Sequence, residues 1–252
     1  MSKIVLITGA TAGIGEACAG LFAAQNYDLI LAGRREDRLA QLASDLTGKY
    51  GVRVITVRLD VRNKTEVQEK LEGLPDGWKE VDVLVNNAGL SLGLDPIHEG
   101  STDDWDVMVD TNVKGLLYVT KVVSNWMVAR KSGHIVNLGS IAGKETYPNG
   151  NVYCATKHAV DSLNKAMRID LLPHHIKVTG IHPGAVETEF SEVRFKGDLN
   201  RAKKVYEGFD PLMAADIADA IWYAVSRPAH VNINDMVIMP SAQASSGHLL
   251  RK

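Results

Sequence analysis

The chain contains little of what marks a disulfide-bonded or membrane-spanning protein. Its 252 residues include only two cysteines, Cys18 and Cys154, which lie far apart and form no Cys-x-x-Cys pair. This scarcity excludes a disulfide scaffold and a thiolate metal site, and it is typical of a reducing compartment. No stretch approaches the roughly 20 apolar residues that a membrane helix needs, and the apolar run at 4–7 is too short for a signal peptide. We therefore expect a cytoplasmic protein with no membrane partner.

An excess of charge of either sign is also missing. The 28 basic residues are balanced by 30 acidic ones, for a formal net charge of −2. No overall field attracts nucleic acid, and we expect no nucleic-acid partner. The eight histidines form no His-x-x-x-His pair, and we expect no metal site. With 45% hydrophobic residues the chain can bury a sizeable core, and an α/β chain of this length commonly forms one domain, here residues 1–252.

Short apolar runs alternate with longer amphipathic stretches along the whole chain. The expected strands are residues 4–8, 28–32, 52–60, 81–86, 133–138, 176–182 and 236–239. The expected helices are residues 13–25, 36–49, 64–71, 102–130, 152–172 and 214–225. The strand runs are continuous in Val, Ile and Leu, as in parallel strands that are covered on both faces. The pattern predicts an α/β fold, a doubly wound Rossmann-type three-layer sandwich with a seven-stranded parallel sheet.

One irregular stretch, residues 184–211, follows an expected strand. It has mixed charge and little periodicity. A loop of this length in a compact domain is usually a functional lid or a binding segment. We expect a substrate lid at about 184–211.

A glycine-rich turn at residues 8–15 joins the first expected strand to the first expected helix. Glycine lets a phosphate approach the backbone N–H groups of a helix N-terminus, whose partial positive charge favours anions. The candidate cofactor-binding residues of this turn are Gly9, Thr11, Gly13, Ile14 and Gly15. The spacing is Gly-x-x-x-Gly-x-Gly rather than Gly-x-Gly-x-x-Gly, so a tight β–α connection without a ligand is the alternative.

Two adjacent arginines, Arg34 and Arg35, follow the second expected strand. In dinucleotide-binding folds the adenosine ribose is recognised at this position, where NAD enzymes place an acid. The planar fork of arginine suits the 2′-phosphate of NADP, so the pair indicates NADP as the cofactor. Two alternatives remain open, namely that Glu36 or Asp37 binds the ribose hydroxyls and that the charges belong to a solvated helix start.

The candidate catalytic residues lie at the end of the fifth expected strand and in the helix that follows it. Tyr153 and Lys157 are spaced i, i+4 and project from one face of a helix. A neighbouring ammonium favours the phenolate and lowers the pKa of a tyrosine, so that Tyr153 can exchange a proton with an alcohol or carbonyl during hydride transfer. Ser140, at the end of the strand, can orient the reacting oxygen.

The ordered set of motifs resembles the short-chain dehydrogenase/reductase family over essentially the whole chain. It comprises Thr8-Gly9-x-x-x-Gly13-x-Gly15, Asp60-Val61, Asn86-Asn87-Ala88-Gly89, Asn112, Ser140, Tyr153-x-x-x-Lys157 and Pro183-Gly184. The resemblance implies a catalytic set of Asn112, Ser140, Tyr153 and Lys157, in which Asn112 helps to hold a relay water and Lys157 also binds the nicotinamide ribose. The further cofactor residues that it implies are Asp60, Val61, Asn87, Ala88, Gly89, Pro183, Gly184, Val186 and Thr188. It also implies a homotetramer that pairs helices 102–130 and 152–172 across an interface.

Segments 190–198 and 228–234 resemble the NADP-dependent 3-hydroxy acid dehydrogenase subgroup of that family. This resemblance implies an NADP-dependent oxidoreductase for a small 3-hydroxy acid such as serine or allo-threonine. Such a substrate needs a cation for its carboxylate, and Arg194 or Lys196 can supply it; we expect Arg194, beside Ser140 and Tyr153, in the substrate site. The alternatives are a broad-specificity NADPH carbonyl reductase for keto esters or aldehydes and a regulatory protein that binds NADP without turnover.

Overall fold

The computed structural model describes residues 2–252. Seven strands form one sheet in the order β3–β2–β1–β4–β5–β6–β9, and every neighbouring pair is parallel. The strands are β1 (Ile4–Thr8), β2 (Asp28–Gly33), β3 (Val54–Arg58), β4 (Val81–Asn86), β5 (Gly133–Leu138), β6 (Ile176–Pro183) and β9 (Asp235–Ile238). The order reverses between β1 and β4, which places the usual ligand crevice of this fold above these two strands.

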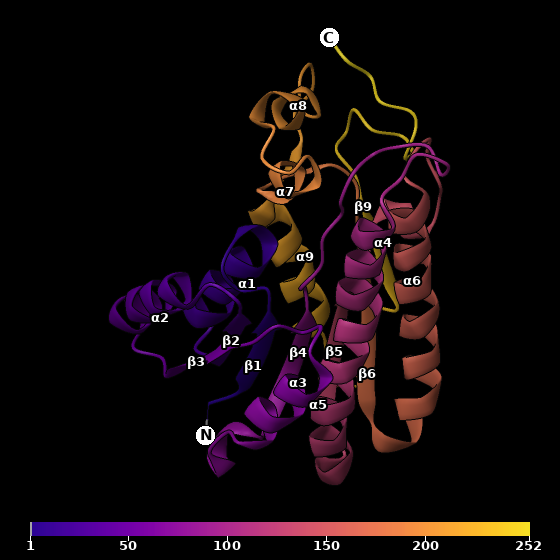
Figure 1. Ribbon diagram of the computed structural model, residues 1–252. Helices are drawn as coiled ribbons and strands as arrows, with labels where there is room; N and C mark the ends of the chain where they lie inside the picture. The colour runs from indigo at the N-terminus through magenta and orange to yellow at the C-terminus, as the bar shows by residue number, and fades with distance from the viewer. Residues whose placement is uncertain (1) are drawn as a thin grey trace.

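Helices cover both faces of the sheet (Figure 1). One face packs against α1 (Gly13–Ala24), α2 (Glu36–Tyr50) and α9 (Ala214–Val225). The other packs against α3 (Lys64–Glu72), α5 (Leu116–Arg130) and α6 (Asn151–Leu171). The expected doubly wound Rossmann-type sandwich with a seven-stranded parallel sheet is confirmed.

Strand β1 shows why the strand sequences read as continuous apolar runs. Val5 and Ile7 point into the core below α1, α2 and α9, while Ile4 and Leu6 point into the core below α3 and α5. Because successive side chains of a strand lie on opposite faces, a sheet covered twice needs apolar residues at every position.

The long helix expected at 102–130 is interrupted. It consists of α4 (Thr102–Val109), a π-helical turn (Asp110–Gly115) and α5. Such turns are rare and occur often at functional sites, and this one carries Asn112. The strand expected at 52–60 is shorter, ending at Arg58, so that residues 59–61 lie in the loop above the sheet.

The stretch 184–211 has more regular structure than its sequence indicated. It contains α7 (Phe190–Arg194), α8 (Leu199–Lys204) and a short strand β7 (Val186–Glu187), which pairs with β8 (Leu212–Met213). Helices of five and six residues make fewer than two turns, too few to establish a periodic pattern. The segment lies beyond the carboxyl ends of the strands (Figure 1). Across residues 2–252, every helix is too short or too polar to cross a membrane.

Candidate active site

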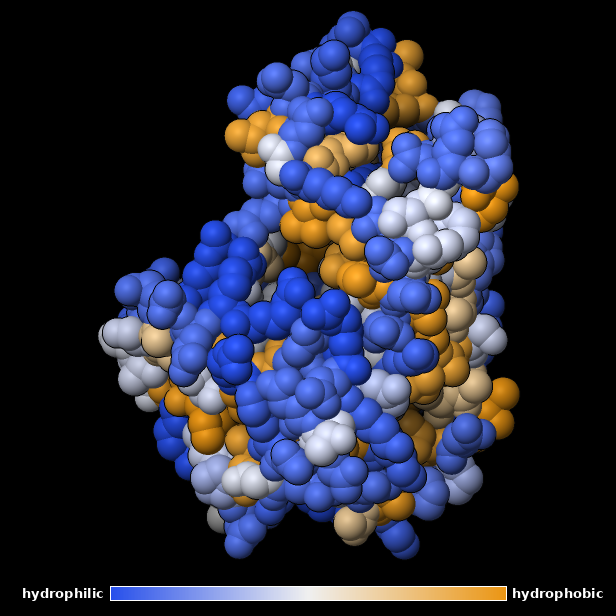
Figure 2. Space-filling view, in the orientation of Figure 1, coloured by the Kyte–Doolittle hydropathy of each residue, from blue (hydrophilic) through white to orange (hydrophobic). Residues whose placement is uncertain are grey.

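A crevice opens above the carboxyl ends of the strands, beneath α7. It encloses a cavity of about 340 Å³, and Figure 2 shows a hollow there with hydrophobic residues above it and to its right and hydrophilic residues below it and to its left. The sequence-predicted residues that line it are Gly9, Thr11, Gly13, Ile14, Arg34, Arg35, Asp60, Val61, Asn87, Ala88, Gly89, Ser140, Tyr153, Lys157, Pro183, Gly184, Val186 and Thr188. Gly15, Asn112 and Arg194 lie behind this lining.

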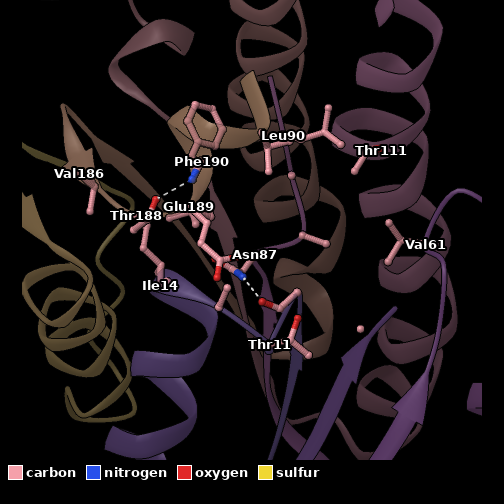
Figure 3. Close-up of a pocket in the computed structure, with 18 of the residues that line it drawn as sticks. Thr11, Ile14, Val61, Asn87, Leu90, Thr111, Val186, Thr188, Glu189 and Phe190 are labelled. Atoms are coloured by element: carbon pink, nitrogen blue, oxygen red, sulfur yellow. Dashed lines mark hydrogen bonds between the residues drawn. The ribbon is translucent and has the colours of Figure 1, made fainter. Parts of the chain in front are cut away.

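The glycine-rich turn is held in a conformation that a side chain would disrupt. Gly9 has a φ of +65° and Gly13 a φ of +53°, in the left-handed region. A Cβ on Gly15 would collide with the carbonyl oxygen of Gly9 and lie 2.6 Å from Nδ2 of Asn87. Asn87 Nδ2 donates to the carbonyl oxygens of Thr8 (2.9 Å) and Gly9 (3.1 Å), which ties the turn to the end of β4 (Figure 3).

The turn leaves the start of α1 available to an anion. Its N-cap residue, Ala12, has no side chain that could accept a hydrogen bond from the first N–H groups of the helix. The free N–H groups and the helix dipole together favour a phosphate. A Cβ on Gly13 would stand 3.0 Å from Cγ2 of Thr188, so the segment after β6 packs directly over this turn. These features fit the pyrophosphate of a dinucleotide.

The two arginines after β2 have different surroundings. Arg35 donates from Nε to Thr11 Oγ1 (3.0 Å) and from Nη2 to the Thr11 carbonyl (3.2 Å), and its Nη1 lies 2.8 Å from Oε2 of Glu189. Arg34 is exposed, and no carboxylate of residues 2–252 forms an ion pair with it. Asp60 is bonded to Arg62 (2.6 Å), which lowers the pKa of Asp60, with a smaller contribution from the charge of Arg34.

Ser140, Tyr153 and Lys157 meet at the far end of the crevice. Ser140 follows β5 and is held by a hydrogen bond from the Ala142 N–H to its Oγ (3.1 Å). Tyr153 and Lys157 come from successive turns of α6, as their spacing predicts, and both are buried. Lys157 Nζ donates to the Leu138 carbonyl (2.9 Å) and lies 6.0 Å from the centroid of the Tyr153 ring.

Burial dominates the electrostatics of this pair. It lowers the pKa of Lys157 to about 8, because the ammonium has lost its water and faces no carboxylate. It also raises the pKa of Tyr153, against the charge of Arg194 and hydrogen bonding with Ser140. Without a cofactor, Tyr153 is therefore a neutral phenol at pH 7.

Asn112 lies behind Lys157 in the π-helical turn. Its Nδ2 donates to the Leu90 carbonyl (2.8 Å) and to Thr156 Oγ1 (3.0 Å), and its Oδ1 accepts from the Leu90 N–H (2.8 Å). A Cβ on Gly89 would lie 3.2 Å from this Oδ1 and 3.5 Å from Lys157 Nζ, so both polar atoms face the same glycine. Oδ1 thus accepts one hydrogen bond and keeps a second lone pair.

Arg194 is the cation nearest to the phenol ring. Its guanidinium carbon lies 5.2 Å from the ring centroid of Tyr153 and 5.1 Å from that of Phe190. Nη2 donates to the hydroxyl of Tyr147 (3.0 Å), while Nε is buried with no hydrogen-bond partner in residues 2–252. Lys196, the other candidate carboxylate ligand, is largely exposed and pairs with Asp104 (2.8 Å).

An ion network that no local sequence signal indicated supports this end of the site. His182 Nε2 lies 2.9 Å from Asp235 Oδ1, and Lys144 Nζ lies 2.6 Å from Asp161 and 3.4 Å from Asp235. These residues come from β6, β9, α6 and the segment after Ser140. The network thereby joins the elements that position the reacting groups.

Sequence reasoning missed part of the crevice wall. The missed lining residues include Leu90, Thr111, Glu189, Phe190 and Val193. Glu189 and Phe190 follow Thr188, and Figure 3 shows them beside Thr188 across from Ile14 and Asn87. They lie inside the stretch expected to act as a lid, which was the only signal available for them.

Comparisons with known proteins agree with this arrangement. The short chain dehydrogenase family matches residues 3–198. The chain is 49% identical to the NADP-dependent 3-hydroxy acid dehydrogenase YdfG of Salmonella typhi over 97% of both chains, and 45% identical to sulfoacetaldehyde reductase 2 of Chromohalobacter salexigens over 98% of this chain and 97% of that one. The structure of a closed serine dehydrogenase with NADP⁺ superposes with a TM-score of 0.92, at 45% identity over 99% of both chains. The chain belongs to the short-chain dehydrogenase family.

Proposed function

We propose that this protein is an NADP-dependent oxidoreductase that moves a hydride between nicotinamide and the hydroxyl or carbonyl carbon of a small 3-hydroxy acid, such as serine or allo-threonine. The observation that carries the proposal is the guanidinium of Arg194, which lies beside Tyr153 with no carboxylate partner in the described chain. The names of the YdfG relative and of the serine dehydrogenase structure support the same substrate class.

The crevice fits NADP from end to end. Arg34 offers an unpaired cation for the 2′-phosphate at one end, the start of α1 offers N–H groups for the pyrophosphate, and Lys157 stands at the nicotinamide end. Asp60 and Val61 would flank the adenine, and residues 87–89 and 183–188 would enclose the middle of the cofactor. NADP, when bound, supplies hydride transfer at its nicotinamide.

Side chains of the protein donate and accept the proton that the reaction transfers to or from the substrate oxygen. Because burial raises the pKa of Tyr153, its phenol is protonated at pH 7 and can donate to the carbonyl oxygen of a keto acid or aldehyde. In the oxidative direction Tyr153 must first lose that proton. Lys157 and Arg194 would then stabilise the phenolate, while Ser140 orients the reacting oxygen and Asn112 holds a water behind Lys157.

Arg194 selects substrates by charge. A 3-hydroxy acid carries its carboxylate two bonds from the carbinol carbon, so a hydroxyl bound by Tyr153 and Ser140 places the carboxylate close to these side chains. A carboxylate there would form charge-assisted hydrogen bonds with the free N–H groups of Arg194. The same guanidinium accepts a sulfonate, which is consistent with the name of the sulfoacetaldehyde reductase relative. An acid-bearing aldehyde is therefore the second candidate substrate, within the broader alternative of a carbonyl reductase.

The test is steady-state kinetics with NADP(H) and NAD(H) across serine isomers, allo-threonine, 3-hydroxypropionate, sulfoacetaldehyde and uncharged keto esters. We expect turnover of the acids with NADP and, for Arg194→Ala, a rise in KM of about 100-fold on acids with little change on keto esters. Lys196→Ala is the matched control from the same segment, because Lys196 is paired and exposed. Unchanged kinetics of Arg194→Ala on serine, or a wild-type preference for keto esters over every acid, would reject the assignment.

The proposal also covers the lid, the oligomeric state and the compartment of the protein. Residues 184–211 would act as the lid of a single cofactor-binding domain, because they cover the crevice beyond the strands. Exposed apolar side chains on α5 and near the end of α6, including Leu117 and Ile169, support the homotetramer implied by the family resemblance. Two buried free thiols, Cys18 and Cys154, support a reducing compartment such as the cytoplasm.

A further inference from the structure

One carboxylate bridges the crevice from the lid to the adenosine end of the site. Glu189 precedes α7, and Arg35 and Arg38 lie at the start of α2, more than 150 positions away in the sequence. We propose that Glu189, Arg35 and Arg38 form a latch that holds the lid across the cofactor crevice, and that Arg35 is a positioning residue rather than the ligand of the 2′-phosphate. The inference deepens the proposed function and rests on it, because it assumes that the crevice binds NADP.

Both oxygens of Glu189 are used in the latch. Oε2 lies 2.8 Å from Nη1 of Arg35, and Oε1 lies 2.6 Å from Nη1 of Arg38. These bonds lower the pKa of Glu189, so the carboxylate stays ionised at neutral pH. One side chain thus connects the segment after β6 to the first turn of α2.

Arg35 also fixes the phosphate-binding turn. Its Nε and Nη2 donate to the hydroxyl and carbonyl of Thr11. All three nitrogens of Arg35 are therefore already bonded to Thr11 or Glu189, and two of its five N–H groups, one on Nη1 and one on Nη2, remain for another partner. Arg34, which is exposed and has no ion pair in the described chain, is the guanidinium that remains free for the 2′-phosphate.

The latch connects the two ends of the crevice through consecutive residues. Thr188 packs over Gly13 of the phosphate-binding turn, Glu189 reaches the arginines, and the ring of Phe190 lies 5.6 Å from that of Tyr153. Figure 3 shows the three residues next to one another, with the hydrogen bond from the Phe190 N–H to Thr188 Oγ1 drawn as a dashed line. Fixing Glu189 therefore fixes both the residue above the pyrophosphate site and the aromatic wall beside the proposed acid.

The ion pairs are suited to a reversible closure. About 41% of the Glu189 side chain, 42% of that of Arg35 and 51% of that of Arg38 are exposed. Pairs this exposed are weak and are screened by salt. We expect loss of both pairs to increase lid opening about three- to tenfold, which leaves a closed lid able to open for cofactor exchange.

Limited trypsin digestion of the cofactor-free protein measures lid opening, because the lid carries cleavable Arg194, Lys196, Arg201, Lys203 and Lys204. We expect E189Q to be cut in the lid about three- to tenfold faster than wild type at low salt, with an unchanged thermal midpoint. Glu192→Gln, on exposed α7 surface without an ion pair in the described chain, is the matched control and should behave as wild type. At 1 M NaCl wild type and E189Q should be cut at the same rate.

A mutant cycle isolates the pairing itself. In a chain carrying R35M and R38M, which is already unlatched, E189Q should change the cleavage rate less than twofold. Equal cleavage of E189Q and wild type at low salt, or a full effect of E189Q in the arginine-free background, would overturn the latch. These readouts need no NADP, so they decide the latch separately from the proposed cofactor.

Adenosine 2′,5′-bisphosphate tests the division between the arginines. We expect R34M to weaken its binding at least fivefold more than R35M does. Comparable losses would overturn the positioning role of Arg35. A wild-type protein that does not bind the bisphosphate would overturn the proposed cofactor and the role of Arg34, while the digestion would still decide the latch.

Discussion

Replacing Lys157 by methionine should make the protein more stable at pH 7 while abolishing turnover. Lys157 is 6% exposed, and burial lowers its pKa to about 8. Each pKa unit corresponds to about 1.36 kcal/mol, so a shift of roughly 2.5 units from an unfolded value near 10.5 means that the buried ammonium costs about 3 kcal/mol at pH 7. Methionine has a similar length and carries no charge.

The net gain is smaller than this cost. Lys157 Nζ donates a hydrogen bond to the Leu138 carbonyl (2.9 Å), and its loss removes about 1 kcal/mol. The remaining stabilisation of about 2 kcal/mol corresponds to a rise of roughly 4–8 °C in Tm for a chain of this size.

The pH dependence has a definite sign. Below its folded pKa the lysine is charged in both states, and the full cost is present. Above that pKa the folded lysine is neutral while the unfolded one still binds a proton, so wild-type stability rises with pH and the advantage of methionine shrinks. We expect the advantage to fall by about 2 kcal/mol between pH 7 and pH 9.5.

Urea unfolding of cofactor-free wild type and Lys157→Met at the two pH values measures this advantage. Lys203→Met is the control, because Lys203 is exposed and its replacement should change stability by less than about 0.5 kcal/mol at either pH. A Lys157→Met protein that is less stable than wild type at pH 7, or whose advantage does not change with pH, would refute the reasoning.

Three further predictions concern the site. Tyr153→Phe should lower kcat at least about 100-fold with an unchanged Kd for NADPH, measured by fluorescence titration, and equal turnover of both proteins would argue against an acid at this position. Gly15→Ala should abolish NADPH binding or folding, because its Cβ would meet the Gly9 carbonyl, whereas Gly20→Ala in the same helix meets nothing within 4 Å and should raise Tm slightly in a thermal melt. Arg34→Ala should raise KM for NADP about tenfold or more with little change for NAD, and an equal loss for both cofactors would contradict the phosphate assignment.

Local sequence was sufficient for those features that depend on spacing. The continuous apolar runs predicted a parallel sheet covered on both faces, and the i, i+4 spacing predicted that Tyr153 and Lys157 share one face of α6. The π-helical turn at Asn112 had no such signal, because a single extra residue in a helix changes neither its composition nor its overall periodicity.

The lid was predictable only as an irregular stretch. Its length and lack of periodicity indicated a functional loop, but helices as short as α7 and α8 leave no pattern to read. The contacts of the lid could not be predicted from the sequence either, since the pairing of Glu189 with Arg35 joins positions 154 residues apart.

The sequence by itself determined the fold class, the position of the phosphate-binding turn and the identities of the proposed catalytic residues, because periodicity, glycine spacing and motif order are properties of the linear chain. Only the tertiary structure decided which charges act on which groups. It placed Arg194 rather than Lys196 beside Tyr153, committed Arg35 to Thr11 and Glu189 while leaving Arg34 free, and buried Lys157 without a carboxylate. The strength of a charge depends on its burial and its neighbours, and both are set by segments that are distant in sequence.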